Sequence, residues 1–208
     1  MLLEIYVVGD RIIMKKLYKS HLFVLSAPSG TGKTTLGNLL LQDWPDKITR
    51  IITSTTRPPR KQERNGIDYH FIEESEFRTK QSRGEFLEFA EVFGFLYGTE
   101  MRELKDTALL EKKLLLMIDT QGALQVKKKI PNAVLIFISP PNKEELYSRL
   151  QGRNTETAHT LKRRLKDFEK EMSEMKHYDY HIVNDDLQKT LLVLKSIIIA
   201  EEHKIERG

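Results

Sequence analysis

A short glycine-rich segment constrains this sequence more than any other feature. It runs from Ala27 to Thr34 and fits the pattern G-x-x-x-x-G-K-[ST], except that alanine holds the first glycine position. A short apolar run at 22–26 precedes it, and leucines at helical spacing follow it until Pro45. A strand, a glycine turn and a helix in this order predict a loop whose backbone N–H groups wrap a polyphosphate.

Each residue type in this loop suits phosphate chemistry. Gly30 and Gly32 allow the backbone to approach the phosphates, and Lys33 can reach the β and γ oxygens as a compact cation. The Thr34 hydroxyl is placed to coordinate the Mg²⁺ that bridges those oxygens. The residues expected to bind the triphosphate are Ala27, Pro28, Ser29, Gly30, Thr31, Gly32, Lys33, Thr34 and Thr35.

The rest of the chain alternates short apolar runs with helical patterns. Residues 114–118 and 134–138 are continuous apolar runs, typical of strands buried on both faces of a parallel sheet. Further strands are predicted over 48–53, 69–72 and 180–183, and helices over 142–150 and 187–198. This order predicts an α/β fold of the phosphate-loop NTPase type, with a parallel β-sheet core flanked by helices and a separate strand-rich middle.

Composition excludes several classes of protein. The 208 residues, 39% of them hydrophobic, suffice for one domain with a subdomain. The absence of cysteine excludes disulfides and thiolate zinc sites, and it favours a reducing, cytoplasmic location. The apolar runs are far shorter than the roughly 18 residues that span a bilayer, and the N-terminus lacks the basic start of a signal peptide. We therefore expect no membrane partner.

Basic residues gather in two segments. The net charge of +4, with 31% charged residues of mixed sign, is a weak indicator of nucleic-acid binding. Residues 50–64 hold five basic residues and one acid, and residues 149–166 hold six and one. No strip of aromatic residues accompanies them, so we expect no nucleic-acid partner, and the two basic segments require another explanation.

A set of motifs beyond the phosphate loop resembles the guanylate kinase family. In chain order these are Ser26-Ala27-Pro28-Ser29-Gly30, Thr55-Thr56-Arg57-Pro58-Pro59-Arg60, Glu63, Gly66, Asp68-Tyr69, Tyr97-Gly98-Thr99, Asp119-Thr120-Gln121-Gly122 and Val183-Asn184-Asp185-Asp186. The likeness spans roughly residues 22–203. It implies ATP-dependent phosphorylation of GMP and dGMP to GDP and dGDP in purine nucleotide metabolism, with Mg²⁺ as cofactor. It leaves open whether the protein is a monomer or a homo-oligomer.

The resemblance also implies a division of the chain into parts. Residues 1–20 would be an N-terminal extension, and residues 21–206 a guanylate kinase-like domain. Within that domain the core would comprise 21–53, 100–148 and 172–206, the GMP-binding subdomain 54–99, and a helical lid 149–171. The two basic segments then fall in the implied GMP subdomain and the implied lid.

The resemblance assigns the GMP contacts to eight residues. Those expected at the phosphate are Arg57, Arg60, Tyr69 and Tyr97, and those at the guanine are Thr53, Glu88, Thr99 and Asp119. Guanidinium groups suit the phosphate because they make bidentate contacts that lysine cannot make. A carboxylate at Glu88 suits guanine N1–H, whereas adenine N1 is an acceptor and leaves buried polar groups unpaired, at roughly 1 to 3 kcal/mol each.

Phosphoryl transfer depends on positioning and charge cancellation, so no general base is expected. The resemblance implies Lys33, Arg57, Arg149, Arg153 and Arg164 as the catalytic residues. Closure of the lid would place its arginines over the phosphates and exclude water. The resemblance also places Asn184 near the donor adenine.

One position departs from the family pattern. The family commonly has Asp-Ile-Asp where this chain has Met117-Ile118-Asp119. The missing acid leads us to expect a normal fold with altered Mg²⁺ dependence.

Two rival functions stay open at this point. A related binding module that has lost catalysis usually has a degraded phosphate loop, whereas Gly32, Lys33 and Thr34 are intact here. A kinase with a sugar-phosphate acceptor would not need a carboxylate such as Glu88 facing a purine edge.

Overall fold

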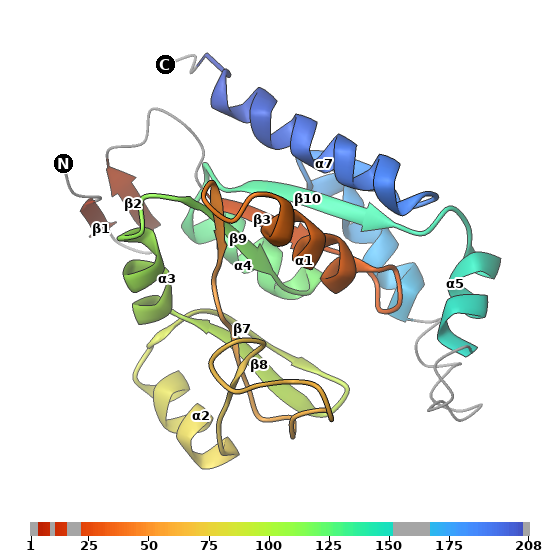
Figure 1. Cartoon of the computed structure of the whole chain (residues 1–208). Coiled ribbons are helices and arrows are strands. Elements are labelled where there is room, and N and C mark those ends of the chain that lie inside the picture. The colour runs from red at the N-terminus through yellow and green to blue at the C-terminus, as the bar shows by residue number, and fades with distance from the viewer. Residues whose placement is uncertain (1–3, 9–10, 16–21, 152–166, 206–208) are drawn as a thin grey trace.

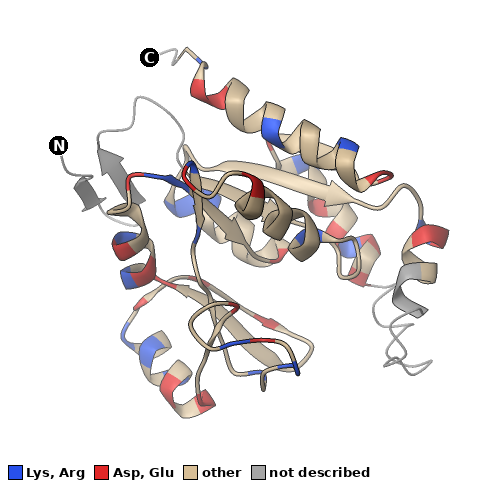
Figure 2. Ribbon diagram, in the orientation of Figure 1, with Lys and Arg blue, Asp and Glu red and all other residues tan. Residues whose placement is uncertain are grey.

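The computed structural model describes residues 4–8, 11–15, 22–151 and 167–205 of this chain. A five-stranded parallel sheet lies at its centre, in the order β11-β10-β3-β9-β4 (Figure 1). Its strands are β3 (Leu22–Ser26), β4 (Ile48–Arg50), β9 (Lys113–Met117), β10 (Val134–Ser139) and β11 (Tyr180–Val183). Strands β3 and β10 are buried throughout and carry no charge, as expected for the centre of a parallel sheet (Figure 2).

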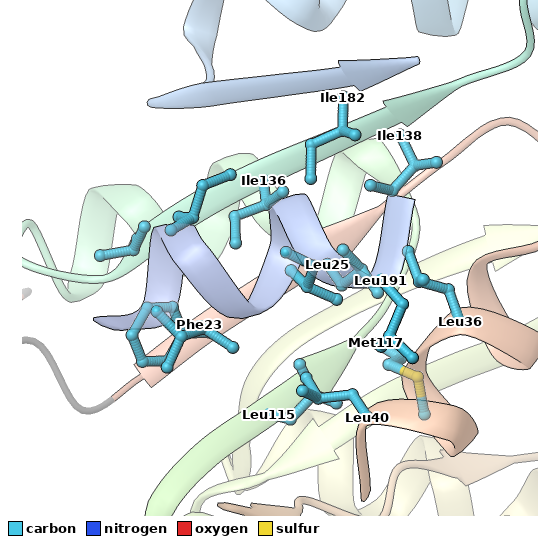
Figure 3. Packing of buried hydrophobic residues seen from close by; sticks show 14 of the residues in the cluster. Phe23, Leu25, Leu36, Leu40, Leu115, Met117, Ile136, Ile138, Ile182 and Leu191 are labelled. Carbon is cyan, nitrogen blue, oxygen red and sulfur yellow. The ribbon is translucent and has the colours of Figure 1, made fainter. Parts of the chain in front are cut away.

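Helices cover both faces of this sheet because successive side chains of each strand point to opposite sides. Val24 lies in register between Leu116 and Leu135, and all three pack on the side of α3 and α4. Phe23, one residue earlier, points to the side of α1 and α7 (Figure 3). The helices are α1 (Lys33–Asp43), α3 (Met101–Ala108), α4 (Thr120–Lys129) and α7 (Leu187–Glu202).

The packing against α1 and α7 forms one of the two large cores of the protein. Leu36 and Leu40 of α1 are completely buried against strand residues (Figure 3), and so is Leu194 of α7. Each such side chain contributes about 1.5 to 3 kcal/mol through removal of apolar surface from water. This core holds α1 on the sheet, and the phosphate loop lies directly before the first residue of that helix.

A second, four-stranded sheet contains the strand-rich middle of the chain. Its order is β6-β5-β8-β7, and α2 (Glu74–Ser82) packs on it through Phe77, which stacks on Phe86 with ring centroids 4.4 Å apart. Phe93 and Gly94, with φ of 53° and 83°, form the two-residue turn of the β7–β8 hairpin. The strands are β5 (Ser54–Thr55), β6 (His70–Phe71), β7 (Phe86–Val92) and β8 (Phe95–Glu100).

Side chains of α4 fasten the second sheet to the first. The Gln125 amide donates to the carbonyl of Phe89 at 2.7 Å and accepts from its N–H at 3.3 Å. Lys129 donates to the carbonyl of Leu87 at 2.6 Å. These bonds hold β7, an edge strand of the second sheet, directly against α4, the helix that follows β9.

Three further elements complete the described structure. They are the antiparallel hairpin of β1 (Glu4–Val8) and β2 (Arg11–Lys15), helix α5 (Lys143–Gln151), and a helical segment at 167–173 that continues into η1 (Glu174–His177). Among the described helices, none combines the length and apolar character that a membrane crossing requires.

The strand predicted over 48–53 is divided in the structure. Strand β4 ends at Arg50, and the chain then enters the other sheet as β5. The apolar pattern continues across the division because Ile51 and Thr53 are also buried. The terminal helix extends beyond the prediction, to Glu202.

Candidate active site

A cavity of about 360 Å³ lies at the carboxyl edge of the parallel sheet, lined by residues of both sheets. The phosphate loop follows β3, Asp119 follows β9, and such an edge is where ligands bind in open α/β folds. The predicted site residues that line the cavity are Ala27, Pro28, Ser29, Gly30, Gly32, Lys33, Thr34, Thr35, Thr53, Arg60, Tyr69, Glu88, Tyr97 and Asp119. The structure therefore brings most of the predicted site together in one place.

The phosphate loop needs glycine at two positions for its shape. Gly30 and Gly32 have φ of 91° and 101°, in the left-handed region that side chains disfavour. Gly32 is also the residue before α1, so the helix begins at Lys33 with its free N–H groups beside the cavity. This arrangement provides backbone donors and the positive end of a helix dipole for a phosphate.

Asn184 supports this loop from the end of β11. Its buried side-chain amide donates to the carbonyl of Thr31 at 2.7 Å, and its backbone N–H donates to the carbonyl of Ser139 at 2.8 Å. Asn184 is not among the residues that line the cavity, and its expected place near the donor adenine stays a prediction.

Lys33 lies where the loop meets the end of β9. Its ammonium group donates to the carbonyl of Ile118 at 2.6 Å. Burial lowers the pKa of Lys33, and the nearby carboxylates of Asp119 and Glu171 oppose that shift. A phosphate would offer this ammonium group stronger acceptors than a carbonyl does.

The cavity lining includes charged residues that were not predicted as site residues, among them Asp167, Lys170 and Glu171. Burial raises the pKa of Glu171 to about 7, against the influence of Lys33 and of a hydrogen bond from the Ser29 backbone. These residues lie on the helical segment at 167–173, where the sequence shows only an ordinary amphipathic pattern. No local motif distinguishes their acids from surface acids, so the signal was absent from the single sequence.

Arg57 belongs to a preorganised group beside the cavity. Its guanidinium donates to Glu63 at 2.9 Å and to the Tyr97 hydroxyl at 3.2 Å, and it lies over the Tyr69 ring at 5.6 Å. Burial alone would lower the pKa of Arg57, but the hydrogen bonds to Glu63 and Tyr97 outweigh it and raise that pKa. Glu63 also accepts from the Arg60 backbone at 2.8 Å, whereas the Arg60 side chain is 69% exposed at the rim.

Glu88 lies on β7 where a β-bulge between Phe86 and Glu88 shifts the register. It is only 2% exposed, and its Oε1 accepts from the Thr99 hydroxyl at 2.6 Å. Burial raises the pKa of Glu88 to about 7, with the Thr99 bond opposing and the Asp119 charge adding to the shift. Thr99 thus lies behind Glu88 and does not itself line the cavity.

Asp119 has a structural bond as well as a place in the cavity. Its Oδ1 accepts from the Gly122 N–H at 2.9 Å and caps α4. Two carboxylates, those of Glu88 and Asp119, therefore face the same space beside Thr53. An acceptor-rich pocket of this kind fits a ligand edge that carries several N–H donors.

Some predicted residues cannot be placed. Arg153 and Arg164 lie outside the described residues, and only the backbone of Arg149, in α5, is described.

Among the described residues no cluster of three or more His, Asp or Glu side chains could hold a metal ion. The exposed Thr34 at the cavity suits Mg²⁺, which usually binds one or two protein oxygens together with substrate phosphates.

Met117 occupies the position where the family commonly has an acid. It is 7% exposed, lines the cavity and packs on α1 beside Leu36 and Leu40 (Figure 3). A Cβ atom added at Gly37 would lie 3.3 Å from Met117 Cε and closer still to Sδ. Because Gly37 has no side chain, the thioether of Met117 can occupy this space.

Comparisons with known proteins agree on one family. The sequence model described as "Guanylate kinase" matches residues 19–201. The chain is 47% identical over 189 residues to a guanylate kinase of Protochlamydia amoebophila, covering 91% of this chain and 95% of that protein. It is 46% identical over 186 residues to one of Syntrophotalea carbinolica, covering 89% and 88%. A crystal structure of guanylate kinase from Anaplasma phagocytophilum superposes with a TM-score of 0.74 and 37% identity, over 90% of this chain and 88% of that one.

Proposed function

The chain belongs to the guanylate kinase family, and from this premise we propose that it transfers the γ-phosphoryl group of ATP to GMP, giving ADP and GDP. The single observation that supports this proposal best is the shared cavity, which joins the phosphate loop to Glu88 and Tyr97 of the second sheet. Two phosphate-bearing ligands can meet there. Because the assigned GMP contacts are to base and phosphate, we propose that dGMP is accepted as well.

We propose a division of labour among the parts of the chain. The core at 21–53, 100–148 and 172–206 binds ATP, residues 54–99 bind GMP, and residues 149–171 act as the lid. The sheets support the first two assignments, since the phosphate loop follows β3 of one sheet and Glu88 lies on β7 of the other. We propose that residues 1–20 form an extension, since the family match begins at residue 19, near the end of this segment.

The proposed GMP phosphate site is centred on Arg57. Glu63 and Tyr97 already hold its guanidinium in a fixed orientation, so little side-chain freedom is lost when a phosphate binds. Arg60, at the rim, and the hydroxyls of Tyr69 and Tyr97 add further donors.

The proposed guanine site is centred on Glu88. Its carboxylate accepts from guanine N1–H and the exocyclic amine, with Asp119 as a second acceptor. The Thr53 hydroxyl, which lines the cavity, donates to O6, whereas the Thr99 hydroxyl donates its one proton to Glu88 and contributes to the site by fixing the rotamer of that carboxylate. A base without these donors leaves the two carboxylates unpaired, which provides selectivity.

At the donor site, the loop amides, Lys33 and Thr34 hold the triphosphate and its Mg²⁺. The ion, when bound, cancels negative charge on the β and γ oxygens. Lys33 exchanges its carbonyl partner for phosphate oxygens, and Asn184 keeps the loop in shape. Arg149, Arg153 and Arg164 of the lid supply further positive charge, and closure excludes water that would otherwise accept the phosphoryl group. We place this reaction in the purine nucleotide metabolism of the cytoplasm.

The proposal is tested by a coupled assay of ADP formation, with ATP, Mg²⁺ and one of GMP, dGMP, AMP, CMP or UMP. We expect turnover with GMP and dGMP only, and we expect Glu88→Gln to weaken GMP by roughly tenfold in kcat/KM because one acceptor becomes a donor. The matched control is Glu73→Gln, at an exposed position directly before α2 that does not line the cavity. Equal rates with AMP would overturn the base assignment, and GMP binding without any turnover would favour the binding-module alternative.

A further inference from the structure

Gly122 is a glycine that the backbone conformation does not explain. It lies in the first turn of α4, and it is not among the glycines with positive φ. Glycine in such a position weakens a helix relative to alanine, because alanine loses less backbone entropy on folding. The reason for glycine here must therefore lie in what surrounds the Cα atom.

That surrounding is the carboxylate of Glu88. A Cβ atom built on Gly122 would lie 3.0 Å from Glu88 Cδ and closer still to Oε2. The third neighbour, Ile118 Cδ1, would be 3.2 Å away. The atoms that leave no room for a side chain are thus those of the carboxylate proposed to bind guanine.

The structure around this contact fixes both partners. Gln125 and Lys129 hold α4 on the main chain of β7, so the helix cannot easily move away from the strand. Glu88 is held from its other side by the 2.6 Å bond from Thr99. A methyl group at position 122 would therefore displace the Glu88 carboxylate and disturb its bond from Thr99, because one side-chain bond yields more easily than the backbone of α4 or β7.

We infer that Gly122 is a positioning residue for base selectivity, because its missing side chain leaves the room in which the Glu88 carboxylate stays directed into the cavity. The inference rests on the proposed function, in which that carboxylate binds the guanine edge. Gly122 acts through Glu88 and does not line the cavity itself. Glycine at position 122 thereby keeps the Glu88 carboxylate where it can accept from the N1–H and the exocyclic amine of guanine.

The test uses the full chain with Gly122→Ala. We expect KM for GMP to rise about tenfold or more, while KM for ATP stays within about twofold, because the donor site is untouched. The ratio of kcat/KM for GMP over inosine monophosphate, which lacks the exocyclic amine, should fall by about fivefold or more. If Gly122 affected only the stability of the helix, the GMP-to-inosine monophosphate ratio would stay unchanged, and KM for GMP would not change separately from KM for ATP.

A second background keeps the test specific. In Glu88→Asp the carboxylate is one methylene shorter and withdrawn from position 122, so adding Gly122→Ala should change KM for GMP by less than about twofold. Lys128→Ala, on the exposed side of α4, is the matched control and should match the wild type.

The outcomes separate the inference from the function on which it rests. If the wild-type chain phosphorylates GMP and Gly122→Ala leaves both KM for GMP and the base ratio unchanged, the inference is wrong and the proposed function stands. An equal loss for ATP and GMP would also overturn it, since that pattern indicates a general change of structure. A wild-type chain without GMP turnover overturns both.

Discussion

The surroundings of Glu88 bring the pKa of its carboxyl close to neutral pH. Almost complete burial raises the pKa of this carboxyl to about 7, although the Thr99 hydroxyl favours the charged form. A protonated carboxyl offers a donor where guanine also presents donors, so only the ionised group can accept from both. The base site should consequently respond to pH in a range where most carboxylates do not.

We expect GMP binding to tighten as the pH rises. With a pKa of about 7, the ionised fraction of Glu88 grows from about one tenth at about pH 6 to about nine tenths at about pH 8. The sign follows because the form that binds guanine is the one favoured above the pKa. The dissociation constant of GMP, measured by calorimetry, should fall by about tenfold over that range.

The control for this pH dependence is Glu88→Gln, which cannot titrate at this position. Its remaining pH dependence comes from the GMP phosphate and from other groups, and it is subtracted from that of the wild type. Parallel profiles of the two proteins would show that Glu88 is not the group responsible.

At the scale of elements, α1 and β9 fit together through an unusual pair. Met117 of β9 occupies space that any side chain on Gly37 of α1 would need. Met117 lines the cavity and also packs in the core (Figure 3), so we expect a substitution at Gly37 to shift the Met117 side chain. Glycine at position 37 thus leaves the space for Met117, which stands where the family commonly has an acid.

A double-mutant cycle tests this packing. Gly37→Ala should lower the free energy of unfolding by about 1 to 3 kcal/mol through overpacking, even though alanine is the better helix former. In a Met117→Ala background the same change should be neutral or stabilising, because the methyl group then fills vacated space. Urea unfolding of the four proteins gives the coupling energy, expected at about 1 to 3 kcal/mol. Additive effects would mean that the two side chains do not compete for space.

At the scale of the whole molecule, residues of both sheets line the cavity, and each sheet carries the residues proposed to bind a different substrate. The five-stranded sheet holds the phosphate loop, and the four-stranded sheet holds Glu88 and Tyr97. In Figure 1 the smaller sheet lies apart from the larger one, with α4 between β7 and the centre of the molecule. Each substrate, when bound alone, should therefore stabilise mainly the part of the chain that is proposed to bind it.

Hydrogen exchange can measure this separation. GMP alone should slow amide exchange in residues 54–99, and a non-hydrolysable ATP analogue with Mg²⁺ should slow it in residues 27–35, because bound ligands oppose local opening. AMP in place of GMP serves as the matched control. Protection by GMP confined to the parallel sheet would contradict the proposed division of the chain.

Much of this architecture follows from local sequence. Continuous apolar runs predicted the buried strands β9 and β10, because a strand covered on both faces has no polar side. The motif at 27–34 predicted the phosphate loop, since its glycines, lysine and threonine are close neighbours in the sequence and need no distant segment to form the loop. The division of the strand at Arg50 was missed, because burial continues on both sides of the change of sheet.

The sequence by itself determined the α/β class and the phosphate loop, and its resemblance to a family named the candidate site residues. Only the tertiary structure decided that Glu63 and Tyr97 orient Arg57, that Glu171 lies beside Lys33, and that Gly122 leaves room for Glu88. The physical reason is distance along the chain. Periodicity and motifs record interactions within a few residues, whereas these contacts join segments that packing alone brings together.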